Sequence, residues 1–158
     1  MADKYIKVQS ISGFAEYLPG EQLAFEDVRG RIEKVYRRYG FTPLETPAVE
    51  RWEILTAKGG LDRQIYAVGK PGEDTAEKPE LGLHFDLTVP LARFVAQYAS
   101  ELAFPFRRCQ VQPVWRGERP QQGRFRQFYQ ADIDIIGSGE LDPIYEAEVL
   151  CVVSEVFG

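Results

Sequence analysis

Two long runs of strand-forming residues, separated by a short turn, constrain the fold of this chain most. Residues 106–116 and 124–137 are rich in Val, Ile and aromatic side chains, which favour β-strands. Between them lies "GERPQQG", a seven-residue segment with Gly at both ends and a Pro inside. Because a loop of this length joins neighbouring strands, we predict that the two runs form a long antiparallel hairpin.

The rest of the chain supplies helices and shorter strands around this hairpin. Helical spacing of apolar residues and a following Gly40 predict a helix over 21–39. The prolines of "FTPLETPAVE" (41–50) predict an extended segment at a sheet edge or an interface. A short helix is predicted over 50–57, and two short strands over 63–69 and 81–85 are joined by a charged, mobile hairpin loop over 70–80. A further helix is predicted over 86–103 with Thr88 as N-cap. The last helix has Asp142 as N-cap and Pro143 as first residue. This order predicts an α+β domain, an antiparallel sheet flanked by helices on one side.

The charge of the chain is unevenly distributed. The formal net charge is -5, yet the segment from Arg107 to Arg126 holds six arginines and a single acid, Glu118. That segment therefore carries +5, and the rest of the chain carries -10. An acidic body argues against general coating of nucleic acid, whereas a local basic segment indicates an anion-binding site.

The sequence lacks the marks of several other classes of protein. No apolar run approaches the ~20 residues of a membrane span, and the N-terminus lacks the apolar stretch of a signal peptide, so we expect a cytoplasmic protein with no membrane partner. With one histidine, His84, and two cysteines, Cys109 and Cys151, the chain has too few ligands for a zinc cage, and we expect no metal site. We expect His84 to be structural and both thiols to be buried.

Alternation along the second predicted strand divides its side chains between two faces. Apart from one Gln, the odd positions suit a core: Phe125, Gln127, Tyr129, Ala131, Ile133 and Ile135. The even positions are mostly polar: Arg124, Arg126, Phe128, Gln130, Asp132, Asp134 and Ile136. Two interpretations remain open at this point. The even face is either a solvated surface with one exposed Phe, or a binding floor with arginines for phosphate, a ring for a base and a carboxylate for a cation.

At these residues the sequence resembles a known family. "VWRGERPQQGRFRQFYQADIDIIG" (114–137) is similar to motif 2 of class II aminoacyl-tRNA synthetases, in the form found in histidyl-tRNA synthetases. Three more stretches resemble that family in the expected order: "GFAEYLPGE" (13–21), the motif 1 segment "YGFTPLETPAVE" (39–50) and the amino-acid-binding block "LHFDLTVPLARFVA" (83–96). The resemblance covers nearly the whole chain and implies a partial class II synthetase catalytic fold.

The resemblance implies a reaction and its partners. It implies that ATP, with Mg²⁺ on its phosphates, activates histidine to histidyl-adenylate, which then reacts with the acceptor end of tRNA(His). Motif 1, within residues 21–50, implies a homodimer interface. Residues 1–158 correspond to the N-terminal portion of the catalytic domain with motifs 1 and 2. Motif 3, which supplies a second arginine over ATP, and the anticodon-binding domain are absent from these residues, so we expect the isolated chain to be inactive.

The resemblance also implies roles for particular residues, and Arg116 is the implied catalytic residue at the α-phosphate. The implied ATP-binding residues are Arg116, Glu118, Arg124, Arg126 and Phe128, with Phe128 stacking on adenine. The implied histidine-binding residues are Asp86, Thr88, Gln130 and Asp134. The implied tRNA contacts are Arg119, Gln121 and Gln122. Simpler alternatives stay open: Asp86 and Thr88 cap a helix, Asp134 is an exposed strand acid, and the loop side chains are solvated. Where the family commonly has an arginine before Pro or Tyr, this chain has His84-Phe85.

Three functions compete on this reading. The first is a histidine–tRNA ligase. The second is the regulatory subunit of ATP phosphoribosyltransferase in histidine biosynthesis, a relative that generally loses the ATP arginine and the "ERPQ" loop. The third is a non-catalytic dimerisation or RNA-binding fragment. Arg116, Glu118 and the loop are all present, which favours the ligase.

Overall fold

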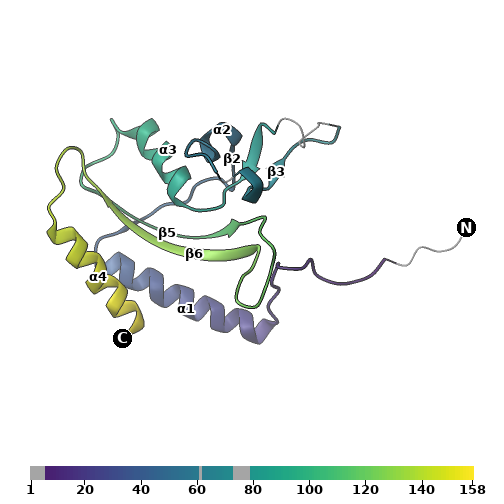
Figure 1. Ribbon diagram of the computed structural model, residues 1–158. Coiled ribbons are helices and arrows are strands. Elements are labelled where there is room, and N and C mark those ends of the chain that lie inside the picture. Colours follow the sequence, from purple (N-terminus) through teal and green to yellow (C-terminus); the bar gives the residue numbers. More distant parts are fainter. Residues whose placement is uncertain (1–5, 61, 73–78) are drawn as a thin grey trace, which may run out of the picture.

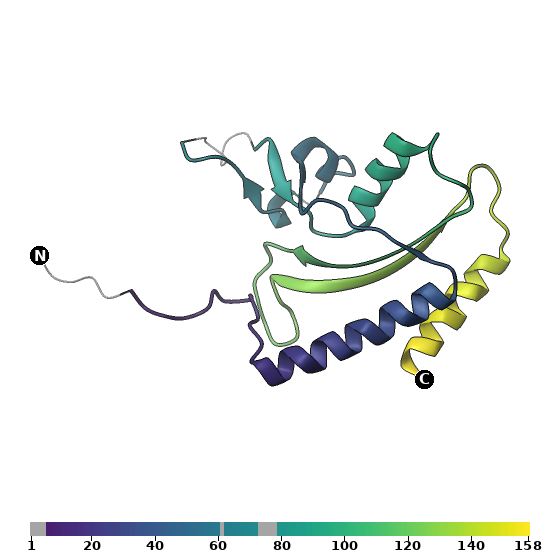
Figure 2. The same ribbon diagram turned by 180° about the vertical axis from the view of Figure 1, so that it is seen from behind.

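The computed structural model describes residues 6–60, 62–72 and 79–158 and arranges them in layers about one long hairpin (Figure 1). The elements are α1 (Pro19–Arg38), β1 (Thr42–Pro43), β2 (Val49–Arg51), α2 (Trp52–Leu55), the 3-10 helix η1 (Asp62–Gln64), β3 (Ala67–Val68), β4 (Leu81–Leu83), α3 (Thr88–Tyr98), β5 (Phe106–Trp115), β6 (Gln127–Ile136) and α4 (Ile144–Phe157). Helices α1 and α4 lie on one side of the β5–β6 hairpin, while α2, α3 and a small sheet lie on the other (Figures 1 and 2). The predicted α+β class is confirmed, but the expectation of helices on only one side of the sheet is wrong, because α2 and α3 lie on the other side.

The β5–β6 hairpin is the predicted one. The strands pair antiparallel along their full length, from Phe106 opposite Ile136 to Trp115 opposite Gln127. The connection runs from residue 116 to residue 126, longer than the predicted 117–123. It is longer because it folds into its own turn, in which Gln121 and Arg124 exchange backbone hydrogen bonds of 3.2 and 2.9 Å.

The prediction of one antiparallel sheet is refined to two three-stranded sheets. In the first, ordered β1-β5-β6, the short β1 runs parallel to β5, so Pro43 occupies the predicted sheet edge. The second, ordered β2-β4-β3, is antiparallel and contains both predicted short strands. Gly82 in its central strand is required by packing, because a Cβ there would lie 2.8 Å from Ile65 Cγ2. Of the predicted mobile loop 70–80, residues 73–78 lie outside the described part of the chain.

The layer of α1 and α4 covers one face of the hairpin through an apolar core. Its buried members are Val35, Tyr36, Phe41, Cys109 and Val152, with Ile133 and Ile135 packed against them. Tyr36 also donates a 3.1 Å hydrogen bond from Oη to the carbonyl of Ala131. The odd positions of β6 thus face the helices, as the alternation predicts. A separate core of Leu55, Ile65 and Phe85 lies in the other layer.

The ends of several helices differ from prediction. Pro19 is inside α1, and Gly40, with φ +77°, follows its end as predicted. The prediction of Thr88 as N-cap is wrong: Thr88 is the first helical residue, and Asp86 Oδ1 accepts the 3.0 Å hydrogen bond from Val89 N. Asp142 Oδ1 accepts from Ile144 N at 2.9 Å, so its side chain caps α4 as predicted, but the helix begins at Ile144 and the prediction of Pro143 as its first residue is wrong.

The two cysteines have different environments. Cys109 is 3% exposed, as predicted, but the prediction that Cys151 is buried is wrong. Its neighbour Val152 takes the inward position on α4, so Cys151 is turned to the surface. Burial raises the pKa of the Cys109 thiol.

Candidate functional site

The pairing register of the hairpin gathers polar side chains on the face opposite α1 and α4. Arg108 lies opposite Asp134, Gln110 opposite Asp132, and Gln112 opposite Gln130. Cross-strand partners of this kind share one face of a sheet. We call this face the polar floor, and its members are Arg108, Gln110, Gln112, Phe128, Gln130, Asp132 and Asp134.

A buried ion pair forms one end of the polar floor. Arg108 Nη2 lies 2.6 Å from Asp134 Oδ2, and the arginine side chain is 0% exposed whereas that of Asp134 is 37% exposed. Arg108 Nη1 also donates a 3.2 Å hydrogen bond to Gln110 Oε1. Burial lowers the pKa of Arg108, and the charges of Asp134 and Asp132 oppose that fall. The acids therefore favour the charged form of this buried guanidinium.

An amide network anchors the floor to the segment between β1 and β2. Gln110 Nε2 donates to Thr46 Oγ1 at 3.0 Å, and Gln112 exchanges hydrogen bonds of 3.1 Å with the backbone N–H and carbonyl of Thr46. Gln110 Nε2 donates to Gln112 Oε1 as well. Thr46 and Gln110 are buried, so these groups are satisfied within the fold. Sequence reasoning missed this network and Arg108, because Arg and Gln in a strand usually face water.

Asp132 lies between the two charged ends of the site. Burial raises the pKa of its carboxyl; Arg108 opposes that rise, Asp134 and Asp86 add to it, and Arg116 opposes it. These interactions bring Asp86, from the turn before α3, and Arg116, from the end of β5, into one electrostatic cluster with the floor. Asp86 therefore both caps α3 and contributes charge to the site.

Arg116 crosses from the end of β5 to the start of β6. Its Nε donates to the carbonyl of Phe85 at 3.1 Å, and its guanidinium carbon lies 4.9 Å from the centre of the Phe128 ring. The backbone is held on both sides, since Arg116 N donates to Arg126 O at 2.8 Å and Gly117 N donates to Gln64 O at 2.7 Å. A fixed cation therefore covers the aromatic ring of the floor.

The remaining predicted ATP-binding residues form the base of the loop. Glu118 pairs with Arg124, which is exposed. Arg126 Nε donates to the carbonyl of Glu118 at 3.1 Å, and Nη1 donates to Ser12 O at 3.4 Å. Gly13 permits this packing, because a Cβ there would lie 2.9 Å from Arg126 Cγ. Arg126 thus ties the N-terminal segment to the hairpin, while Arg124 reaches the surface.

The predicted tRNA and histidine contacts divide between surface and floor. Arg119, Gln121, Gln122 and Thr88 are exposed. Gln130 is half-buried, and its Oε1 has no hydrogen-bond partner among the residues that the structure describes. His84 is fully buried, as expected, with Nε2 2.8 Å from the carbonyl of Pro113. It packs against Trp115 with ring centres 5.4 Å apart.

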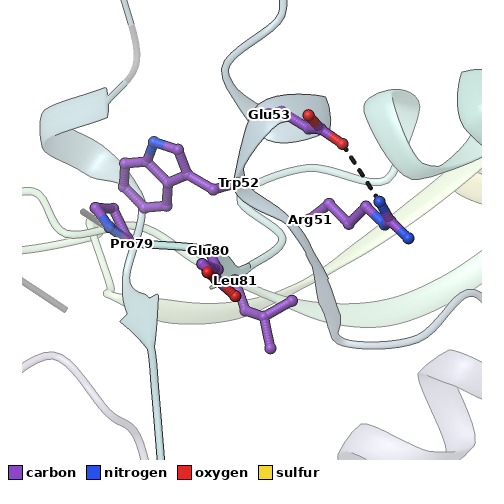
Figure 3. A pocket seen from close by; sticks show the side chains of 6 residues that line it. All are labelled: Arg51, Trp52, Glu53, Pro79, Glu80 and Leu81. Atoms are coloured by element: carbon purple, nitrogen blue, oxygen red, sulfur yellow. Dashed lines mark hydrogen bonds and ion pairs between the residues drawn. The ribbon is translucent and has the colours of Figure 1, made fainter. Parts of the chain in front are cut away.

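Two hollows lie near these elements. One of about 530 Å³ beside α2 and β4 includes none of the predicted site residues; Trp52 and Pro79 line it, with the Arg51–Glu53 pair nearby (Figure 3). The other, of about 380 Å³, lies between the N-terminal segment and the hairpin, and Phe128 borders it. Gln22 and Phe25 of α1 and Tyr129 of β6 also line it, so this hollow opens on the α1 side of the hairpin.

Within the described ranges 6–60, 62–72 and 79–158, no group of three or more His, Cys, Asp or Glu is placed to hold a metal ion. No helix in them is long and apolar enough to cross a bilayer.

Comparison with known proteins identifies close relatives of the sequence. The family profile of histidyl-tRNA synthetases matches residues 13–158. The histidine–tRNA ligase of Xylella fastidiosa strain M12 is 51% identical, over 96% of this chain and 34% of that protein. The chain spans about a third of the length of the curated relatives it matches.

Solved structures agree with the sequence match. The histidyl-tRNA synthetase of Nostoc sp. PCC 7120 superposes with a TM-score of 0.83 at 42% identity, over 96% of this chain and 34% of that one. A Bacillus halodurans protein described as an ATP phosphoribosyltransferase regulatory subunit/histidyl-tRNA synthetase superposes with a TM-score of 0.79 at 22% identity, over 97% of this chain and 38% of that one. The second likeness shows a shared fold. The resemblance noted in the sequence is confirmed.

Proposed function

The chain belongs to the histidyl-tRNA synthetase family, and we propose that it forms part of the site where such an enzyme activates histidine with ATP and transfers it to tRNA(His). In this proposal residues 1–158 are the N-terminal portion of the catalytic domain, carrying motifs 1 and 2. In this proposal the chain, which spans about a third of the length of the curated relatives it matches, does not activate histidine by itself.

One observation carries the proposal: a cation over an aromatic ring adjoins a cluster of carboxylates on a single sheet face. Arg116 covers Phe128 at 4.9 Å, and Asp132 interacts with Arg116 on one side and with Asp134 on the other. A nucleotide needs a cation and a stacking ring, while an amino acid needs a carboxylate for its ammonium group. The face offers both within one electrostatic cluster, as a reaction between the two substrates requires.

For ATP we propose that Phe128 stacks on adenine and Glu118 lies at the adenine edge. The half-burial of Phe128 supports this, because part of the residue remains accessible to a ligand. Arg124 is the better candidate than Arg126 for the outer phosphates. Arg124 is exposed and paired only to Glu118 among the described residues, whereas Arg126 is engaged by two backbone carbonyls.

For histidine we propose Asp86, Thr88, Gln130 and Asp134 as the binding residues. Asp86 is close enough to influence Asp132, and the unpartnered Oε1 of Gln130 is available to accept a hydrogen bond. Thr88 is exposed at the start of α3, two residues from Asp86. The carboxylates would hold the substrate's ammonium group and leave its carboxylate toward Arg116.

In the reaction a carboxylate oxygen of histidine forms a bond to the α-phosphorus, and the bond from that phosphorus to pyrophosphate breaks. Charge grows on the α-phosphate oxygens in the transition state. Arg116 is held in place by the Phe85 carbonyl and the Phe128 ring, so it stabilises that charge without reorganising. We assign no Mg²⁺ ligand to this chain; the ion would be carried by the phosphates of ATP.

The other partners follow from the family. Arg119, Gln121 and Gln122 are exposed on the loop, where they could contact the acceptor end of tRNA(His). The motif 1 segment, residues 21–50, is the proposed homodimer interface, and its exposed Leu23, Val28 and Val49 support this. We place the protein in the cytoplasm.

The regulatory-subunit alternative rests on a structural likeness at 22% identity, which carries fold alone. The presence of Arg116 over Phe128 favours the ligase. A test on the 158-residue chain is an NMR titration with ATP and with L-histidine. We expect ATP to shift the Phe128 and Arg116 resonances, and Arg116→Ala to weaken that binding. A chain that binds tRNA but neither small substrate would support the RNA-binding alternative instead.

A further inference from the structure

Arg108 is a fully buried arginine at the far end of the polar floor from Arg116. No sequence signal singles it out, because it follows another arginine in a basic run. Its guanidinium contacts the carboxylate of Asp134 at 2.6 Å and the amide oxygen of Gln110 at 3.2 Å. Moving a charge out of water is costly, so a buried arginine of this kind is tolerated only with close anionic partners.

The ion pair leaves Asp134 half engaged. Arg108 Nη2 contacts Oδ2, whereas Oδ1 accepts no hydrogen bond within the part of the chain that the structure describes. The Asp134 side chain is 37% exposed, so the carboxylate reaches the surface of the floor while one oxygen is held from below. In this geometry the contact with buried Arg108 favours one rotamer of the Asp134 side chain.

We infer that Arg108 is a positioning residue for the amino-acid end of the site, where it selects the rotamer of Asp134 that offers Oδ1 to an N–H group of the substrate. The inference deepens the proposed function and rests on it for the identity of the substrate. Arg108 itself does not touch the substrate, since its side chain is 0% exposed.

The charges around Asp132 support the same role. Asp132 faces Arg108 and Asp134 on the hairpin, Asp86 from the turn before α3, and Arg116 from the end of β5. The three carboxylates of Asp132, Asp134 and Asp86 therefore have only two guanidinium groups, those of Arg108 and Arg116, to offset their charge. Loss of Arg108 would leave only Arg116 to offset them, so Asp132 would take up a proton at a higher pH and the cluster would attract an ammonium group less.

Arg107 provides a matched control on the same strand. It points to the opposite face, where its Nη2 lies 2.5 Å from Glu148 Oε1 on α4. Arg107→Met and Arg108→Met each remove one arginine from an arginine–carboxylate pair, but only the second faces the polar floor.

The experiment measures the χ1 rotamer of Asp134 by NMR three-bond couplings in the wild-type chain, Arg108→Met, Arg108→Lys and Arg107→Met. We expect one rotamer in the wild type and in Arg107→Met, averaging in Arg108→Met, and partial recovery in Arg108→Lys. Amide dispersion reports whether each variant folds. If Arg108→Met does not fold, the wild-type coupling still decides, because rotamer averaging at Asp134 in the wild type overturns the inference.

L-histidine titrated into the same samples at pH 5 to 8 separates this inference from the proposed function. We expect Arg108→Met to lower the affinity on the order of tenfold, with binding lost at higher pH than in the wild type, and Arg107→Met to leave it unchanged. Histidine binding with equal affinity and a fixed Asp134 in Arg108→Met overturns the inference and leaves the function standing. A wild-type chain that does not bind histidine counts against the proposed site, while the couplings still test the positioning of Asp134.

Discussion

The guanidinium carbon of Arg116 lies 4.9 Å from the centre of the Phe128 ring, at the loop end of the β5–β6 hairpin. The two residues are twelve positions apart, and the strand pairing brings them together. The contact joins the cation that we assign to phosphate with the ring that we assign to adenine. It also explains why an aromatic side chain interrupts an otherwise polar face.

Phe128→Leu should weaken ATP binding by about tenfold, because a base stacked on an aromatic ring loses on the order of 1–3 kcal/mol without it. Phe157→Leu is the control, since Phe157 is 87% exposed on α4, on the opposite side of the hairpin (Figure 1). The measurement is ATP affinity by calorimetry or NMR. Equal ATP affinities of the two variants would show that adenine does not stack on Phe128.

Asp86→Asn separates capping from substrate binding. Asn keeps an oxygen that can accept the hydrogen bond from Val89 N, so the free energy of unfolding should change by less than about 0.5 kcal/mol. The lost charge should reduce affinity for histidine by about tenfold. A variant with wild-type affinity would show that Asp86 is a cap alone.

Asp132→Asn should raise the free energy of unfolding at pH 7. Burial holds the pKa of the folded Asp132 above its usual value, so the folded state binds the proton more tightly than the unfolded state. The contribution of Asp132 to the free energy of unfolding therefore becomes less favourable as the pH rises from the pKa of the unfolded state through the pKa of the folded state. The gain from Asn should shrink as pH falls below that range; urea unfolding at several pH values measures it, and a gain independent of pH would contradict the argument.

The two thiols should differ in reactivity with a disulfide reagent such as DTNB. Cys151 is exposed and should react at least about tenfold faster than Cys109, which is buried and has a raised pKa. Cys151→Ser should abolish the fast phase and leave the slow one. Two equal phases would mean that the core around Cys109 opens readily.

Much of this fold follows from local pattern. Alternation along 124–137 predicts which β6 residues face α1, and Gly40 predicts where α1 ends. The site is harder to predict from the sequence, because its geometry depends on the pairing register of the strands. Arg108 and Asp134 become neighbours only through a pairing that the loop length does not define, and the loop is longer than "GERPQQG" suggests.

Three further features have no local signal at all. Thr46 accepts from Gln110 across 64 positions, and Gly117 N donates to Gln64 O across the two layers. The parallel pairing of β1 with β5 likewise depends on two residues, Thr42 and Pro43, too few to show a strand pattern.

The central claim is that Arg116 acts on ATP within a histidine-activating site. The most direct test replaces the corresponding third of the Xylella fastidiosa ligase, 51% identical to this chain, with residues 1–158 and measures histidine-dependent ATP–pyrophosphate exchange. We expect the chimera to be active, Arg116→Ala to reduce exchange by about 10²–10³-fold, and the exposed Arg119→Ala to change it by less than about threefold. A folded chimera without exchange, or equal losses from the two substitutions, would contradict the account.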